Sequence, residues 1–361
     1  MNNSKLHRNF KLNGNSFATD DEVLAFSKDK HPELYPFLKD WFDEDSFVKI
    51  KTSGSTGNPK ILEIKKEHMV NSARATGTFF DLPENTTALL CLSADYIAGK
   101  MMLVRALVLG WQIDVVVPSS NPLQEITKHY DFCAMVPLQL DNSLSELHRL
   151  KKVIVGGALV SKVLLEKLQD ISTEVFSTYG MTETITHIAL KSLNEYAISL
   201  RGGTTWQSQN FQTLPNIKIS KDARNCLIVN APKLSDTLII TNDIVELISE
   251  TEFKWLGRFD NIINSGGIKL IPEQIEIKLS VVIDHRFFVI GVPDEKLGEK
   301  MVLIVERQES GIRNQELKFM IESLTSLDKF EIPKGIYTVK EFVETETKKI
   351  QRQKTLDSIF M

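Results

Sequence analysis

The sequence lacks the features that mark several large classes of protein. Only three cysteines are present, Cys91, Cys133 and Cys226, and they match no metal-binding spacing, so we expect unpaired thiols in a reducing compartment. No apolar run reaches transmembrane length, and residues 1–8 hold no apolar segment typical of a signal peptide. A formal net charge of −4 provides no basic excess for nucleic acid. We therefore expect a cytoplasmic protein that binds neither nucleic acid nor a membrane.

The order of the predicted elements indicates the fold class. The 361 residues, 42% of them hydrophobic, suffice for two or three domains. Alternating strands and helices predict a parallel or mixed sheet covered on both faces, and the short strands that follow predict an antiparallel β-subdomain or small barrel. The predicted fold is α/β: an N-terminal domain over residues 1–259, with a β-rich subdomain at about 195–259, and a small mobile α+β domain over residues 260–361.

Hydrophobic periodicity gives the individual elements. Helices are expected over residues 21–43, 65–82, 98–109, 161–168, 272–279 and 314–324. Strands are expected over 88–92, 112–117, 132–136, 152–155, 217–219, 227–229, 238–240, 245–247, 253–255, 287–292 and 301–305.

The polar loop from Lys51 to Lys60, with the sequence KTSGSTGNPK, is the first candidate for a binding site. It lies between two β-prone stretches, so it is expected to form the tip of a hairpin. Its glycines allow backbone N–H groups to converge on an anion, its hydroxyls donate hydrogen bonds, and Lys60 adds a positive charge. The loop therefore resembles a phosphate-binding loop, although it lacks the Walker A ending. A solvated turn without a ligand is the alternative.

Four further motifs follow this loop in a fixed order. They read STYGMTE at 177–183, TND at 241–243, LGRFDNIINSGGIKLIPEQIE at 256–276 and TKKIQR at 347–352. Together the five motifs resemble those of the adenylate-forming superfamily, which includes acyl- and aryl-CoA synthetases, peptide-synthetase adenylation domains and luciferases. The resemblance covers residues 52–352. Two positions depart from the pattern, because Asn242 and Lys348 stand where the family has glycine.

The resemblance implies that the chain binds ATP and Mg²⁺. It assigns ATP binding to Thr52, Ser53, Gly54, Ser55, Thr56, Gly57, Lys60, Gly156, Gly157, Ala158, Ser177, Thr178, Tyr179, Gly180, Met181, Thr182, Asp243 and Arg258. The residue types fit these roles: Tyr179 offers a flat face to a purine, Asp243 can accept the ribose hydroxyls, and Glu183 is a hard oxygen ligand for Mg²⁺. For Tyr179 the alternative is a plain core aromatic residue, and for Asp243 and Arg258 it is a surface charge.

The resemblance also implies two half-reactions. Lys349 is the expected catalytic cation, with Thr182 and Glu183, because a positive charge stabilises the transition state in which a carboxylate attacks the α-phosphorus. Coenzyme A then displaces AMP after the C-terminal domain rotates about Asp260. The thiol tunnel is expected at Gly266, Gly267 and Lys269. For Gly266 and Gly267 the alternative is an ordinary turn, and for Lys349 it is a solvated basic tail.

Three segments are similar to the short o-succinylbenzoate–CoA ligases of menaquinone biosynthesis, namely residues 68–73, 92–100 and 156–160. Their small-molecule carboxylate substrate is a dianion with a keto group and an aryl ring. The acid pocket is expected at Tyr96, Gly99, Lys100 and His187, although Tyr96 departs from the family's pattern. The candidates for the partner of the second carboxylate are Lys100, Arg105, Arg201 and His187. For each of them a surface or helix-face charge is the alternative.

Other functions remain open at this point. The chain can be a ligase for another aryl or short acyl acid, a module that loads a carrier protein, or a degenerate nucleotide-binding relative. No carrier domain follows Met361, which favours the CoA ligase. The catalytic-type residues Thr182, Glu183, Asp243 and Lys349 are all present, which argues against a degenerate protein. The sequence leaves the acid and the oligomeric state, monomer or dimer, undetermined.

Overall fold

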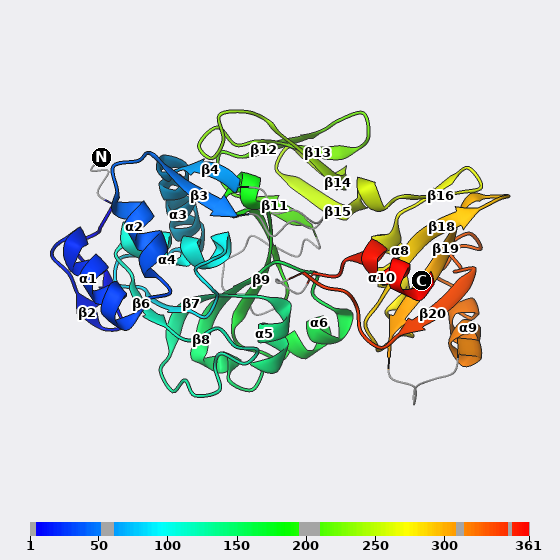
Figure 1. The fold of residues 1–361 in the computed structure, drawn as a ribbon, viewed down its shortest axis with the longest axis horizontal. Coiled ribbons are helices and arrows are strands. Elements are labelled where there is room, and N and C mark those ends of the chain that lie inside the picture. The colour runs from blue at the N-terminus through cyan, green and yellow to red at the C-terminus, as the bar shows by residue number, and fades with distance from the viewer. Residues whose placement is uncertain (1–4, 52–60, 195–209, 308–313, 346–348, 361) are drawn as a thin grey trace.

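One long sheet organises the larger part of the molecule (Figure 1). The computed structural model describes residues 5–51, 61–194, 210–307, 314–345 and 349–360. The sheet has 13 strands, in the spatial order β12 (Lys218–Lys221), β13 (Cys226–Asn230), β14 (Ile239–Leu247), β15 (Glu252–Arg258), β11 (Phe211–Thr213), β10 (His187–Ser192), β9 (Glu174–Gly180), β8 (Leu150–Val155), β7 (Tyr130–Met135), β5 (Thr87–Leu90), β6 (Gln112–Val115), β1 (Lys11–Leu12) and β2 (Asn15–Ser16).

Strands β6, β5, β7, β8 and β9 are parallel and covered on both faces, as the sequence predicts. Helices α3 (Lys66–Phe80) and α4 (Ile97–Leu109) pack on one face, and α5 (Pro137–Asn142) and α6 (Lys162–Leu168) pack on the other. Successive strand residues enter opposite cores because side chains alternate: Ala88 and Leu90 lie with α3 and α4, and Leu89 lies with α5 and α6.

The β-rich region continues the main sheet, and its described strands do not close into a barrel. Strand β11 pairs with β10 on one side and with β15 on the other, so the antiparallel strands extend the sheet edge. The two strands expected at 238–240 and 245–247 form a single strand, β14, with a register shift between Ile244 and Val245. That irregularity bends one strand where the sequence suggested two.

The N-terminal segment differs from its prediction. The single helix expected over 21–43 is wrong: the structure has two helices, α1 (Asp20–Lys30) and α2 (Tyr35–Phe42). Thr19, and not Asp20 or Asp21, caps α1, because its hydroxyl accepts a hydrogen bond from the Glu22 N–H. The hairpin around the polar loop is confirmed as antiparallel β3 (Phe47–Lys51) and β4 (Ile61–Lys65), but the loop itself lies outside the described residues.

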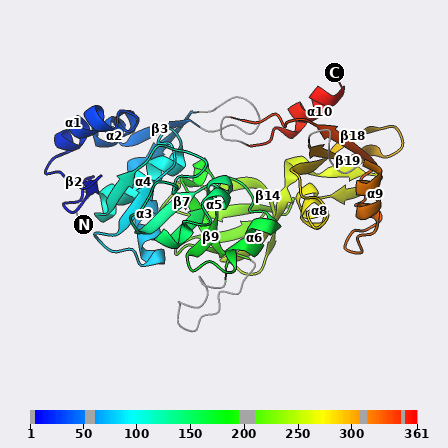
Figure 2. The same ribbon diagram turned by 90° about the horizontal axis from the view of Figure 1, so that it is seen from below.

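A second sheet forms a smaller unit at one end of the molecule (Figures 1 and 2). It has five strands, β16 (Ile263–Ser265), β17 (Ile268–Leu270), β18 (Phe287–Asp294), β19 (Gly298–Glu306) and β20 (Gly335–Val339), and three helices, α8 (Pro272–Leu279), α9 (Asn314–Glu322) and α10 (Arg352–Phe360). Three short 3₁₀ helices complete the described elements, η1 (Leu147–Arg149), η2 (Thr182–Thr184) and η3 (Phe259–Asn261).

The two sheets meet at η3, which follows the last strand of the large sheet and precedes β16. Both views show the segment before α10 reaching from the small unit back toward the large one (Figures 1 and 2). Across the part of the chain that the structure describes, no helix is both long and apolar enough to cross a membrane.

Candidate active site

Two motifs lie together at the carboxyl ends of neighbouring parallel strands. Residues 156–158 follow β8, the motif beginning at Ser177 occupies the end of β9, and Val155 pairs with Ser177. Gly156 is required by close packing, because a Cβ there would lie 2.5 Å from the Thr178 Oγ1. Ligands of open α/β sheets bind beyond such strand ends.

Asp243 is a buried carboxylate that several donors hold in place. The Tyr179 hydroxyl donates to Asp243 Oδ2 at 2.6 Å, and the Trp255 Nε1–H donates to Oδ1 at 3.2 Å. Arg258 Nη1 lies 3.6 Å from the same Oδ1. Burial, and then the Asp243 carboxylate, raise the pKa of Tyr179, so its phenol stays protonated. The expected purine and ribose residues are thus in contact before any ligand binds.

The expected hinge residue belongs to the same network. Arg258 Nη2 lies 2.9 Å from Asp260 Oδ2, so one guanidinium lies between Asp243 and Asp260. Asn242, which replaces the family's glycine, donates to both oxygens of Asp260 at 3.2 Å. The Asn242 Oδ1 accepts a hydrogen bond from Arg224 Nη1 at 2.9 Å. The ribose motif is therefore connected to the hinge through two side chains.

Lys349 lies on the small unit, and its charge interacts with Arg258 of this network. Its backbone N–H donates to Thr345 Oγ1 at 3.1 Å, and the Lys349 carbonyl accepts from the Thr345 N–H at 2.9 Å. Burial, and then the positive charge of Arg258, lower the pKa of Lys349. Lys349 is thus within electrostatic range of Arg258, whereas Lys348 lies outside the described residues.

The loop with Thr182 and Glu183 follows β9 and contains η2. Gly180 precedes it and is obligatory, since a Cβ would lie 2.3 Å from the Thr186 carbonyl oxygen. Glu183 is exposed, and the described residues contain no group of three or more side chains suited to a metal ion. One exposed carboxylate fits Mg²⁺, which takes one or two carboxylates and completes its shell with water and phosphate oxygens.

Arg105 is a buried cation whose side chain contacts Thr186, three residues after Glu183 in the sequence. Its side chain on α4 is 1% exposed, and it donates to Thr76 Oγ1 at 3.3 Å and to Thr186 Oγ1 at 3.2 Å. Within the described ranges no carboxylate pairs with it, and burial lowers the pKa of its guanidinium. His187 joins the same cluster, with its ring nitrogens 3.4 Å from the Thr76 and Thr186 hydroxyls. Burial, and then Arg105, lower the pKa of His187, so the ring is neutral.

The structure separates the other expected acid-pocket residues from this cluster. Lys100 donates to the Asp95 carbonyl at 2.8 Å and lies over the Phe37 ring, so it points toward α2. Gly99 allows a close turn, because a Cβ would lie 2.2 Å from the Ser93 carbonyl oxygen. Tyr96 precedes α4 as its N-cap residue. Arg201 lies outside the described residues.

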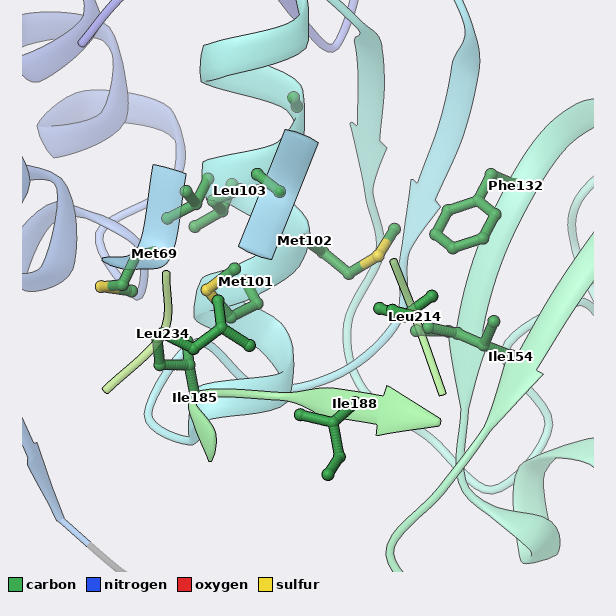
Figure 3. Close-up of a cluster of buried hydrophobic side chains, with 14 of the residues drawn as sticks. Met69, Met101, Met102, Leu103, Phe132, Ile154, Ile185, Ile188, Leu214 and Leu234 are labelled. Atoms are coloured by element: carbon green, nitrogen blue, oxygen red, sulfur yellow. The ribbon is translucent and has the colours of Figure 1, made fainter. Parts of the chain in front are cut away.

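Apolar side chains surround Ile185, which lies between Glu183 and His187. Figure 3 shows Ile185 among Met69, Met101 and Leu234, and all four are buried members of one core. Methionine adapts its shape and contacts aromatic rings well. The surroundings of the acid end are therefore apolar apart from the Arg105 cluster.

The predicted thiol-tunnel glycines form the tip of the β16–β17 hairpin on the small unit. Ser265 pairs with Ile268, and Gly266 and Gly267 have φ of 59° and 84°. A two-residue turn with positive φ at both positions favours glycine. A Cβ on Gly267 would meet no atom within 4 Å, so conformation and not space requires glycine in this arrangement. Lys269 is exposed beside them.

The family model described as AMP-binding enzyme matches residues 10–217. The chain belongs to the AMP-binding enzyme family. By class it is an AMP-forming acid–CoA ligase. The 2-succinylbenzoate–CoA ligase of Bacillus cytotoxicus is 25% identical over 86% of this chain and 69% of the relative. That of Listeria monocytogenes is also 25% identical, over 92% of this chain and 73% of the relative.

Solved structures agree with the fold of this AMP-binding enzyme. An acyl-CoA synthetase (AMP-forming)/AMP-acid ligase II-like protein from Dyadobacter fermentans is 36% identical, with coverage of 91% and 95% of the two chains and a TM-score of 0.58. The o-succinylbenzoate CoA synthetase of Bacillus subtilis in complex with ATP and magnesium is 19% identical, with coverage of 94% and 82% and a TM-score of 0.74.

The structure adds two features of the AMP-binding enzyme that the motifs do not contain. Trp255 donates to Asp243 from the neighbouring strand, and Thr76 and Thr186 hold Arg105. The indole N–H of a half-buried tryptophan needs a hydrogen-bond acceptor, so the sequence could have indicated that Trp255 contacts a polar group. No local pattern connects Thr76, Arg105 and Thr186, since they come from three separate elements.

Proposed function

We propose that this enzyme converts o-succinylbenzoate, ATP and CoA into o-succinylbenzoyl-CoA, AMP and pyrophosphate, the reaction used in menaquinone biosynthesis. The observation that carries the choice of acid is the buried Arg105, for which the described residues provide no carboxylate partner. The names of the curated relatives support the same acid. The substrate class is a small dianionic aryl keto acid.

Burying the charge of Arg105 destabilises the folded protein unless a ligand provides an opposite charge beside it. A guanidinium has five N–H donors, and here two of its donor atoms face hydroxyls while Nη1 lies 3.6 Å from the Met102 sulfur, a weak acceptor. A buried charge without an opposite charge destabilises a folded protein. The carboxylate that is not activated supplies that charge, and a planar guanidinium can bind it through two hydrogen bonds.

Further features of the same region suit this acid. Ser72 Oγ is buried without a hydrogen-bond partner among the described residues, and it lies one turn before Thr76 on α3. An orphaned hydroxyl there is ready for a polar ligand atom, such as a keto oxygen. The apolar side chains around Ile185 provide an environment for the aryl ring (Figure 3).

The nucleotide end has the groups that ATP needs. Tyr179 faces the purine, Asp243 and Arg258 bind the ribose, Thr182 hydrogen-bonds the α-phosphate, and residues 52–60 hold the β- and γ-phosphates. Glu183 holds Mg²⁺, which neutralises phosphate charge when bound. Lys349 stabilises the transition state of adenylation because its cation lies between two anionic reactants.

The second half-reaction uses the small unit differently. We place the domain boundary between residues 259 and 260, with Asp260 as the hinge about which residues 260–361 rotate. Rotation removes Lys349 and brings Gly266, Gly267 and Lys269 to the thiol of CoA. The enzyme needs no other macromolecule for this chemistry, and we place it in the cytoplasm.

The test compares o-succinylbenzoate with two monocarboxylates, 4-oxo-4-phenylbutanoate and 2-butanoylbenzoate. Wild type is expected to form AMP and thioester with the dianion. Arg105→Met is expected to lower kcat/KM for the dianion about 100-fold, because the second carboxylate loses a charge-assisted partner, and to change a monocarboxylate less than about threefold. Arg105→Lys should restore part of the loss, since it keeps the charge without the planar fork.

Arg149→Met is the matched control, because Arg149 is half-buried and donates to the backbone carbonyl of Leu123 at 3.2 Å away from the site. It should leave the preference for the dianion unchanged. The substrate proposal fails if o-succinylbenzoate yields no AMP while another acid does. The role of Arg105 fails if Arg105→Met lowers activity equally with the dianion and the monocarboxylates.

A further inference from the structure

Three short-range backbone hydrogen bonds close the loop between β9 and β10. The Thr184 N–H donates to the Met181 carbonyl at 3.1 Å, and the Ile185 N–H donates to the Thr182 carbonyl at 2.9 Å. The Thr186 N–H donates to the Thr184 carbonyl at 2.7 Å, which closes a three-residue turn. Thr182 and Glu183 lie inside this closed loop.

Thr184 provides the side chain that completes the loop. Its Oγ1 accepts from the Met181 N–H at 2.9 Å and lies 2.7 Å from the Thr186 carbonyl oxygen and 3.0 Å from the Met181 carbonyl oxygen. One hydroxyl proton serves one of these two carbonyls at a time. The side chain is 0% exposed, so solvent cannot replace it. The hydroxyl joins both ends of the loop from within.

The backbone of Ile185 is strained, so the loop keeps its conformation only while neighbouring contacts hold it. Ile185 has φ of 68° and ψ of −55°, a conformation that a β-branched residue adopts only under constraint. Its side chain is 1% exposed and packs among buried apolar residues (Figure 3). Strained backbone persists where surrounding contacts over-determine it, and such strain clusters at functional sites. Here the core holds Ile185 and the Thr184 hydroxyl holds the turn.

The side chains of Thr182 and Glu183 have no hydrogen-bonded anchor among the described residues. Glu183 is exposed, and in the described part of the chain neither Glu183 nor Thr182 uses its side chain in a hydrogen bond. Their positions therefore depend on the backbone of residues 181–186. That arrangement leaves both side chains available to a ligand while their Cα atoms stay fixed.

We propose that Thr184 is a positioning residue for adenylation: its hydroxyl locks the loop so that Thr182 and Glu183 present their oxygens to the α-phosphate and Mg²⁺. This inference rests on the roles given above to Thr182 and Glu183. Without the hydroxyl, the Met181 N–H and the Thr186 carbonyl lose their shared partner and the strained turn relaxes. Glu183 then loses the fixed geometry that Mg²⁺ coordination demands.

The experiment measures ATP binding by titration calorimetry with Mg²⁺ present and with Mg²⁺ removed by chelation, so it needs no knowledge of the acid. Thr184→Val keeps the shape and removes the hydroxyl. It is expected to weaken ATP binding about tenfold with Mg²⁺ and less than about threefold without it, because one hydrogen-bonding group holds the Mg²⁺-binding carboxylate indirectly. Thr184→Ser keeps the hydroxyl and should stay within about threefold of wild type in both conditions.

Thr173→Val is the matched control. Thr173 is 1% exposed, and its hydroxyl donates to the Leu147 carbonyl at 2.7 Å, remote from the loop in the sequence. It should lower the melting temperature without altering the Mg²⁺ dependence of ATP binding. Thr184→Ala takes the place of Thr184→Val if the valine variant does not fold.

The outcomes separate this inference from the proposed function. Wild type that binds ATP equally well with and without Mg²⁺ contradicts the assignment of Glu183. Wild type that depends on Mg²⁺, together with a Thr184→Val variant of unchanged Mg²⁺ dependence, overturns the role of Thr184 alone. A Thr184→Ser variant as impaired as Thr184→Val also overturns it, because the hydroxyl would then not be the deciding group.

Discussion

Asp243 and Arg105 are two buried charges, one at the proposed nucleotide end of the site and one at its proposed acid end, and their surroundings differ. Asp243 is 5% exposed and has the Tyr179 and Trp255 donors and the Arg258 cation around it. Arg105 is 1% exposed and has hydroxyls and a sulfur around it but, among the described residues, no carboxylate.

The difference indicates what each end is built to bind. A carboxylate that is already paired keeps one orientation and still has lone pairs for neutral hydroxyls, which suits a ribose. An unpaired buried guanidinium favours a ligand that brings a negative charge, because the ligand then removes the cost of the buried charge. On the function proposed above, the protein itself preorganises the Asp243 end, and the substrate's second carboxylate completes the Arg105 end.

The largest expected effect concerns Lys349, the proposed catalytic cation. Lys349→Ala should lower acid-dependent ATP–pyrophosphate exchange about 100- to 1,000-fold, since the charge stabilises the transition state. Thioester formation from a supplied acyl-adenylate should remain. Equal loss of both half-reactions would contradict the role of Lys349 in adenylation alone.

The pH dependence sharpens the same assignment. Lys349 must be protonated to act, and its pKa lies below the ordinary lysine value of 10.5 because of burial and Arg258. The adenylation rate should therefore fall as pH rises, with a midpoint below 10.5. Lys349→Arg, which stays charged, should retain a lower rate without this alkaline fall. A wild-type rate that stays constant up to pH 10.5 would contradict the assignment.

The next effect is on stability and should have opposite signs at the two ends. Arg105→Met removes an unpaired buried charge, so the free energy of unfolding of the ligand-free enzyme should stay equal or rise by about 1–3 kcal/mol. Asp243→Asn places an amide against the Tyr179 and Trp255 donors and should lower the free energy of unfolding by about 2–4 kcal/mol. Urea unfolding measures both. Asp141→Asn, at an exposed ion pair with Lys167, is the control and should change it by less than about 1 kcal/mol. If Arg105→Met and Asp243→Asn lowered the free energy of unfolding equally, the two charges would not differ in how the protein compensates them.

The sequence gives a more specific hypothesis for the nucleotide end than for the acid end, and the reason is physical. Residues of the nucleotide end belong to short motifs, so their local spacing indicates the chemistry even before the fold is known. The proposed acid end is assembled from Thr76 on α3, Arg105 on α4 and Thr186 before β10, which only the tertiary packing brings together. Periodicity predicts that Arg105 lies on a helix but cannot show that the helix face is buried.

Similar limits apply to the fold. The alternation of strands and helices was sufficient to predict the parallel sheet, because buried strands are short, apolar and separated by helices. The extension of that sheet through β11 depends on a pairing between Phe211 and Phe253, which are distant in sequence. The strained turn at Ile185 also has no sequence signal, since isoleucine is a poor choice for positive φ.

The smallest expected effect tests the connection between the preorganised end and the hinge. Asn242 donates to Asp260 and accepts from Arg224, and both contacts are lost in Asn242→Gly, which also restores the residue that the family has here. Because a partly exposed hydrogen bond contributes about 0.5–1.5 kcal/mol, thioester formation limited by rotation should become about two- to fivefold faster, with adenylation little changed. Single-turnover rates of the two half-reactions measure this. Asn230→Gly, at an exposed position of β13, controls for placing glycine in a strand. Equal effects of the two variants would show that Asn242 does not restrain the hinge, and the Asp243 end would then be coupled to it through Arg258 alone.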